Sequence, residues 1–222
     1  MEFIFMLTRD DRTVDDALAV YRELAGTDLS MVGFKDVGAT GDTLRALTDA
    51  MHEDGRTVFL EVVSTSRDDE LRSIEAALRC GVDYVMGGTH VDDALPLLAG
   101  SSVRYCPFPG TIVGHPSELR GSIDEIAAHT AELTARPGVE GVDLLAYRHR
   151  GVDPPELVDA VVHAATGPVI VAGSIDGEER IKAMAARGAW AFTIGGAIFA
   201  GLLPGAPSVP VQVQWAVEVA RS

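Results

Sequence analysis

Eight short runs of apolar, often β-branched residues recur along the chain and are separated by longer amphipathic segments. Each run has the length of a buried strand. Runs that are apolar almost throughout are typical of a parallel sheet with both faces covered. The predicted strands are Phe3–Leu7, Ser30–Lys35, Thr57–Val63, Tyr84–Gly87, Val103–Cys106, Gly141–Ala146, Val169–Ala172 and Trp190–Ile194.

The segments between these runs carry apolar residues at helical spacing. One of them places Leu71, Ile74, Ala77 and Leu78 on a single stripe, as a helix packed against a sheet does. Side chains suited to begin a helix lie near Thr13, Asp68, Ser122, Asp153 and Asp176. Glycines suited to end one precede most of the strands, at Gly26, Gly55, Gly81, Gly138, Gly167 and Gly188.

Regular alternation of strand and helix predicts an α/β fold with a parallel sheet. Eight repeats within 222 residues match a single (β/α)8 TIM barrel. No linker or low-complexity segment interrupts them, so we expect one domain over residues 1–222. A doubly wound open sheet is the alternative, but no glycine-rich dinucleotide fingerprint follows the first strand.

One connection is much longer than the others. The segment Pro107–Gly121 contains three prolines and three glycines and follows the fifth predicted strand. Loops after the strands form the active-site face of an α/β barrel. We therefore expect this segment to be a lid or a substrate-binding loop. A last helix is expected over Val211–Arg221.

Charge limits the classes of partner. The chain has 18 basic and 33 acidic residues, a net charge of −15. Nucleic acids and anionic membranes are bound by clustered Lys and Arg, so neither is an expected partner. The uncharged stretch from Ala189 to Leu203 is too short and too rich in glycine to span a bilayer. We expect a cytoplasmic protein; association into a homo-oligomer is compatible with the sequence, which carries no decisive interface motif.

Two glycine turns carry the strongest functional signal. Gly173 and Ser174 follow the seventh predicted strand, and Gly195 and Gly196 follow the eighth. Without a Cβ, backbone N–H groups can close on an anion. Residues from Ala197 onward can form a short helix whose N-terminal dipole attracts negative charge. Phosphate-binding turns after strands 7 and 8 recur in α/β barrels, so we expect a small phosphorylated substrate.

Around these turns the sequence resembles a known superfamily. The segments Val169–Ile175 and Gly188–Ile198 are similar to the closing signature of the ribulose-phosphate-binding barrels, and within it to the N-acetylmannosamine-6-phosphate 2-epimerase family. The resemblance implies a (β/α)8 barrel. It also implies that Gly173, Ser174, Gly195 and Gly196 occupy the phosphate-binding positions.

The resemblance does not extend to the catalytic residues. That epimerase family has a catalytic lysine at the end of strand three, where this chain has Glu61-Val62-Val63. The family's glutamate before the glycine of the seventh turn is replaced by Ala172, and the Asp-x-Lys pair of related decarboxylases is missing. The resemblance therefore transfers the fold and the phosphate site, and leaves the reaction open.

Candidates for the chemistry stand at the ends of the second and third strands. Lys35 is one of only two lysines and closes the second strand. Lysine can donate a proton or form a Schiff base, roles unsuited to arginine. Glu61 is a lone carboxylate in an apolar strand, where burial is costly unless the group is paired or used. We predict catalytic roles for both; a structural ion pair between them is the alternative.

Other polar residues follow strands at the same face. His90, after the fourth strand, is a candidate acid, base or phosphate contact, or else opens the next helix. Arg9 and Arg148 are expected to bind a substrate carboxylate or phosphate. His115 in the long segment is a further substrate-binding candidate. No short ligand spacing among His, Cys, Asp and Glu indicates a metal site, so we expect none.

These observations predict an isomerase or epimerase that moves a proton next to the carbonyl of a phosphorylated, sugar-like metabolite. The first alternative is an aldolase or lyase that uses Lys35 as a Schiff base. Further alternatives are an FMN-binding barrel, which lacks support because no isoalloxazine-stacking insertion is evident, and a non-catalytic barrel. We therefore expect no cofactor.

Overall fold

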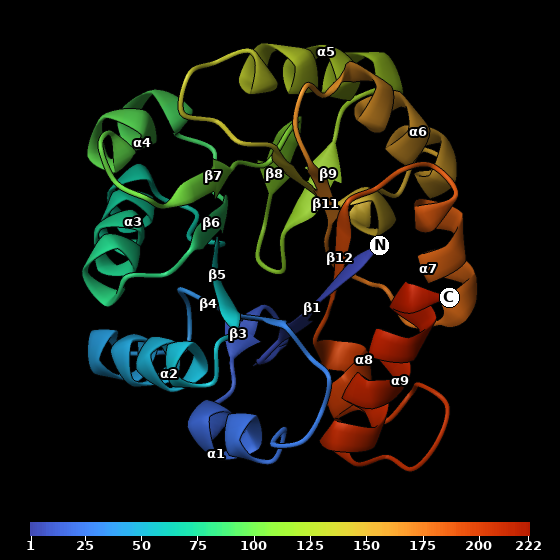
Figure 1. Cartoon of the computed structure of the whole chain (residues 1–222). Coiled ribbons are helices and arrows are strands. Elements are labelled where there is room, and N and C mark those ends of the chain that lie inside the picture. The colour runs from blue at the N-terminus through green and yellow to red at the C-terminus, as the bar shows by residue number, and fades with distance from the viewer.

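The computed structural model describes residues 1–222 and contains one eight-stranded parallel sheet that curls into a barrel (Figure 1). Its strand order is β10-β11-β12-β1-β4-β5-β6-β7. The strands are β1 Glu2–Met6, β4 Met31–Lys35, β5 Thr57–Val62, β6 Tyr84–Gly87, β7 Arg104–Cys106, β10 Val142–Leu144, β11 Val169–Val171 and β12 Ala191–Ile194. All eight predicted strands are present, with ends that differ by one or two residues, and the barrel fold is confirmed.

The barrel is nearly closed at the seam between β7 and β10. No ladder joins these strands, but Glu140 N donates to Tyr105 O at 2.8 Å and Asp143 N donates to Pro107 O at 3.0 Å. Two backbone hydrogen bonds thus bring the edge strands together, and neither edge is free along its length.

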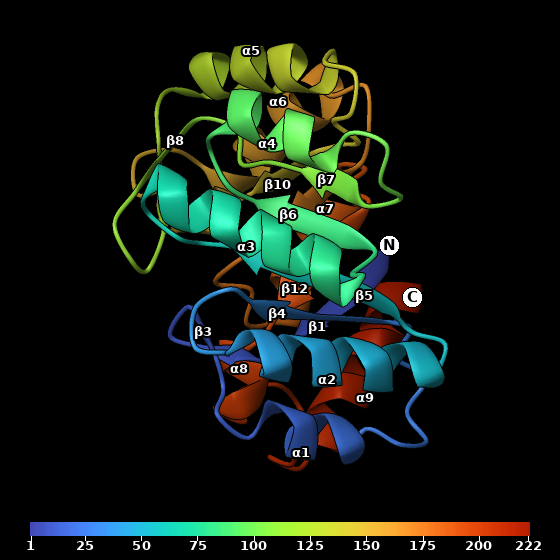
Figure 2. The same cartoon turned by 90° about the vertical axis from the view of Figure 1, so that its left-hand side faces the viewer.

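Helices cover the outside of the barrel, and Figure 2 shows α2 and α3 running along it. They are α1 Ala17–Arg22, α2 Gly41–Glu53, α3 Arg67–Cys80, α4 Val91–Leu98, α5 Ile123–Thr134, α6 Pro154–Ala164, α7 Glu178–Ala185 and α9 Val209–Arg221, with a short α8 at Gly196–Phe199 and a 3-10 turn at Ala146–Arg148. Ser122 and Asp153 cap α5 and α6 as expected. None of the helices has the length and apolar composition needed to cross a membrane.

Two antiparallel hairpins add to the barrel at the carboxyl ends of its strands. The first pairs β2 Thr8–Arg9 with β3 Arg12–Thr13, and the second pairs β8 Thr111–Val113 with β9 Glu118–Arg120 inside the predicted long segment. The helix start expected near Thr13 is found three residues further on, where Asp16 is the N-cap of α1, and Thr13 itself lies in β3. Its hydroxyl donates to Lys35 O at 2.7 Å and accepts from Lys35 N at 2.8 Å, so Thr13 binds the hairpin to β4 instead of capping a helix.

Side chains on the inner face of the barrel change from apolar to polar along the strands. Lys35 on β4 and Glu61 on β5 are partners in the parallel register, so their side chains lie beside each other on the same face of the sheet. Below them the lumen is filled by an apolar cluster: Ile4, Met6, Phe59, Tyr84, Met86, Cys106, Ile170 and Ala191. The barrel lumen is therefore filled by side chains beneath its carboxyl end.

Candidate functional site

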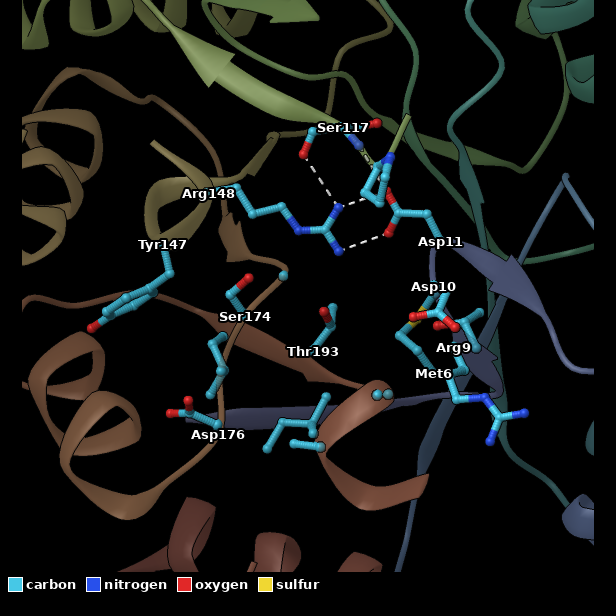
Figure 3. A pocket seen from close by; sticks show the side chains of 18 of the residues that line it. Met6, Arg9, Asp10, Asp11, Ser117, Tyr147, Arg148, Ser174, Asp176 and Thr193 are labelled. Carbon is cyan, nitrogen blue, oxygen red and sulfur yellow. Dashed lines mark hydrogen bonds and ion pairs between the residues drawn. The ribbon is translucent and has the colours of Figure 1, made fainter. Parts of the chain in front are cut away.

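A pocket of about 620 Å³ lies at the carboxyl ends of the strands (Figure 3). It receives residues from the ends of β1, β4 and β5, from both hairpins, and from the turns after β10, β11 and β12. The predicted site residues that line it are Arg9, Lys35, Glu61, Arg148, Gly173, Ser174, Gly195 and Gly196. Pro116, Ser117 and Glu118 of the long segment line it too, as expected for a segment that contacts a ligand.

Four charged side chains form a connected ion cluster at the pocket floor. Lys35 Nζ lies 2.8 Å from Asp11 Oδ1 and 3.2 Å from Glu61 Oε1. Arg148 donates to both oxygens of Asp11, from Nη1 at 2.6 Å and from Nη2 at 2.7 Å, as Figure 3 shows. Asp11, Lys35 and Glu61 are buried. Removing one member would leave an uncompensated buried charge, which costs about 3–5 kcal/mol.

Asp11 is the centre of this cluster, although sequence reasoning did not select it. Besides Lys35 and Arg148, its carboxylate accepts a hydrogen bond from the backbone N of Ser117 at 2.8 Å. Burial favours the neutral acid, but the hydrogen bonds and positive charges of Arg148 and Lys35 outweigh burial and hold the pKa of Asp11 well below its ordinary value.

The backbone is unusual at three non-glycine residues, and all three line the pocket. Asp10, Asp11 and Ser174 have φ values of 52°, 56° and 57°, and no other non-glycine residue has a positive φ. Side chains other than glycine are disfavoured in this left-handed region. Such outliers gather where the surrounding structure and the function require a particular geometry.

The two predicted phosphate turns face the same pocket. A Cβ at Gly173 would collide with Nε of Arg148, and a Cβ at Gly195 would lie 2.7 Å from the backbone O of Thr8. Both positions therefore require glycine for close packing. Gly196 has open space around it and begins α8. The Arg180 guanidinium donates to Ser174 O and lies over the ring of Tyr147, which braces the first turn.

Asp143 on β10 is a second carboxylate that the sequence reasoning missed. It is fully buried, and neither of its oxygens has a hydrogen-bond partner. Burial, followed by the negative charge of Glu61, raises its pKa well above the ordinary value, against the opposing charges of Lys35 and Arg148. The signal was available: like Glu61, Asp143 is a lone carboxylate in an apolar strand.

The two predicted histidines lie outside the pocket lining. His90 stands at the start of α4, where its Nδ1 lies 2.7 Å from Oε2 of the fully buried Glu70. Glu70 also accepts hydrogen bonds from the backbone N of Thr89 and of His90, so this contact secures the beginning of α4. His115 is exposed between β8 and β9. The structure thus does not bring either histidine to the ion cluster.

Comparison with known proteins shows the fold. No family model matches the chain, and no curated protein matches it in sequence. Among solved structures, N-acetylmannosamine-6-phosphate 2-epimerase from Clostridium perfringens aligns with a TM-score of 0.62 and 13% identity, over 88% of this chain and 86% of the epimerase.

Two further structures align over nearly their whole length. Orotidine 5'-phosphate decarboxylase from Pyrococcus horikoshii OT3 aligns with a TM-score of 0.68 and 16% identity, over 99% of each chain. Native KDPGal aligns with a TM-score of 0.70 and 14% identity, over 100% of this chain and 95% of the other. The resemblance drawn from the C-terminal sequence is confirmed as a likeness of fold.

The raised pKa of Asp143 predicts a pH-dependent stability. A carboxyl group whose pKa is higher in the folded than in the unfolded state stabilises the fold at low pH, and this contribution is lost as pH rises above about 4. We expect urea unfolding between pH 5 and pH 7 to show that Asp143→Asn gains stability relative to the wild type as pH rises, by up to about 1.4 kcal/mol per pH unit.

Asp11 does not interfere with this measurement. Its pKa is lowered in the folded state, so its contribution is complete above about pH 4 and is lost only as pH falls further. A constant difference between Asp143→Asn and the wild type over pH 5–7 would show that Asp143 is ionised in the fold.

Proposed function

We propose that this protein is an isomerase or epimerase of a small phosphorylated, sugar-like metabolite, and that it transfers a proton next to a carbonyl group. The observation that carries the proposal is the buried pair of Lys35 and Glu61 at the floor of the pocket. Proton transfer near neutral pH requires a positioned carboxylate or similar base beside a group that stabilises the developing negative charge.

The glycine turns after β11 and β12 serve as the phosphate anchor in this proposal. Gly196 leaves room for an anion beside the first N–H groups of α8, and Ser174 contributes an exposed hydroxyl on the other turn. Backbone N–H groups bind phosphate without adding a charged side chain. This suits a pocket in which Lys35 and Arg148 are already paired with carboxylates.

Glu61 acts as the base and Lys35 as the electrostatic partner. The Lys35 ammonium approaches Glu61 at Oε1, at 3.2 Å, and no hydrogen bond within the protein engages the Glu61 carboxylate. Oε2 takes a proton from the carbon next to the carbonyl. In an epimerisation the proton returns to the opposite face of that carbon. In an isomerisation it goes to the former carbonyl carbon, while the hydroxyl proton passes to the former carbonyl oxygen. An ammonium has three N–H donors. Asp11 accepts a hydrogen bond from one of them, and a remaining donor can stabilise the enolate oxygen.

The same contacts weigh against a Schiff base at Lys35. Nucleophilic attack needs a neutral amine with a free lone pair, whereas this nitrogen contacts two carboxylates within 3.2 Å. Among proteins with this fold, the name of one describes a 2-epimerase of a phosphorylated sugar and that of another a decarboxylase of a phosphorylated nucleotide. Both names describe enzymes of phosphorylated compounds, which is compatible with a phosphate anchor.

Hydrogen exchange tests the proton transfer directly. In D₂O, we expect the protein to introduce deuterium at the carbon next to the carbonyl of one member of a panel of aldose and ketose phosphates, as followed by NMR. Glu61→Gln should lower the exchange rate by about 10²–10⁴-fold, the usual contribution of a general base. Glu178→Gln, which changes an exposed glutamate on α7, should leave the rate unchanged.

The lyase alternative gives a different result in the same samples. Borohydride added with substrate would then trap a covalent adduct at Lys35, and Lys35→Ala would abolish trapping while Lys182→Ala would not. Deuterium exchange that survives in Glu61→Gln, or an adduct at Lys35, would contradict the proposed mechanism.

The phosphate anchor is tested by ligand-induced thermal stabilisation. A ligand at a hundredfold excess over its dissociation constant adds about 2.7 kcal/mol of stability. We expect a sugar phosphate to raise the melting temperature of the wild type and of Gly196→Ala, because a Cβ at this position meets no atom within 4 Å. Gly196→Asp places a negative charge in the same space and should remove the shift.

Two controls show whether the thermal shift comes from phosphate binding at Gly196. The dephosphorylated sugar should produce no shift, and Gly196→Asp without ligand should melt close to Gly196→Ala, since neither side chain is crowded. An equal shift in Gly196→Asp and Gly196→Ala would mean that the ligand's phosphate binds elsewhere.

A further inference from the structure

The β2–β3 hairpin has a carboxylate where its backbone favours glycine. Arg9 pairs with Arg12, so Asp10 and Asp11 form a two-residue turn in which both have positive φ. Tight hairpin turns of this kind prefer Asn-Gly or Asp-Gly, with glycine second. Asp11 at the second position costs backbone energy that glycine would not, and a compensating contact is needed to hold it there.

That contact is the ion cluster, in which Asp11 is buried. Its carboxylate receives Lys35 from β4, both Nη atoms of Arg148 from the turn after β10, and the backbone N of Ser117 from the β8–β9 hairpin. These three donors are far apart in sequence and meet at Asp11; Arg148 Nη1 also donates to Ser117 O at 3.3 Å. Asp10, the other residue of the turn, is exposed and makes no ion pair.

We propose that Asp11 is the positioning residue of the site: its carboxylate holds the Lys35 ammonium against Glu61 and fixes the Arg148 guanidinium beside Gly173. The Arg148 side chain cannot move closer to Gly173, because its Nε already occupies the space that a Cβ at this position would take. The β2–β3 hairpin is the element that delivers this carboxylate. A role in proton transfer for the positioned Lys35 rests on the proposed function; the positioning itself does not.

The lysine content of the chain makes the proposal measurable without any enzymatic assay. Lys35 and Lys182 are the only lysines, and Lys182 is an exposed internal reference on α7. Amine acetylation followed by mass spectrometry therefore gives two separate rates in one sample. In the wild type we expect Lys35 to react much more slowly than Lys182, since its ammonium is buried and held between carboxylates.

Asp11→Gly should raise the acetylation rate of Lys35 at least about tenfold, which corresponds to about 1.4 kcal/mol, and leave that of Lys182 unchanged. Glycine suits the positive φ of this turn, so the hairpin is expected to form. Asp10→Gly is the matched control in the same turn and should keep the wild-type rate at both lysines. Formate, added in excess to Asp11→Gly, should occupy the place of the lost carboxylate and slow Lys35 again.

Asp11→Asn keeps the shape of the side chain and removes only its charge, so it should also accelerate Lys35. Unchanged Lys35 rates in both Asp11 variants would overturn the proposal, as would a faster rate in Asp11→Gly that formate does not reverse. In the deuterium-exchange assay, formate should restore activity to Asp11→Gly. If the wild type catalyses no exchange while the acetylation results hold, the proposed function fails and the positioning role stands.

Discussion

The arrangement of the pocket depends on the buried ammonium of Lys35, which lies between the carboxylates of Asp11 and Glu61. Burying charges is favourable only when each charge has close partners of opposite sign. The parallel register supplies one partner by placing Lys35 beside Glu61 on the next strand. The other, Asp11, comes from a hairpin outside the sheet and brings Arg148 with it. Two cations and two anions then balance, and the group is neutral as a whole.

This balance explains why Asp143 differs from the other carboxyl groups of the site. It lies on the inner face of the barrel, fully buried and without a hydrogen-bond partner. Because the two cations are already matched, ionising a fifth group would add an uncompensated negative charge close to Glu61. Burial and Glu61 together raise the pKa of Asp143, and the apolar cluster beneath offers nothing to offset them.

Much of the fold could be predicted because its strands are covered on both faces, so that they read as continuous apolar runs. Lys35 and Glu61 stood out as charges within such runs; Asp143 carried the same signal and was overlooked. Asp11 could not be found this way. It lies in a polar stretch that resembles an ordinary loop, its turn lacks the glycine that marks a hairpin, and Arg148 is 137 residues away.

His90 follows the fourth strand as predicted, and of the two roles that the sequence left open it opens the next helix and does not line the pocket. A residue that follows a barrel strand points to the pocket only if the chain remains at the rim. Here Gly87 and Gly88, both with positive φ, turn the chain outward, and Glu70 on α3 binds the backbone and the ring of His90. Both glycines and Glu70 were visible in the sequence, but their packing depends on tertiary structure.

Arg148 contacts both the ion cluster and the first glycine turn. Its Nη atoms bind Asp11, while its Nε occupies the space beside Gly173. A side chain at position 173 would therefore displace Arg148, and with it the ion cluster, as well as strain a backbone with φ of 78°. The glycine turn and the Lys35–Glu61 pair cannot shift independently. A ligand bound at the Gly173 turn would therefore lie at a fixed distance from the Lys35–Glu61 pair. A fixed distance between substrate and reacting groups is the geometric condition for catalysis by positioning.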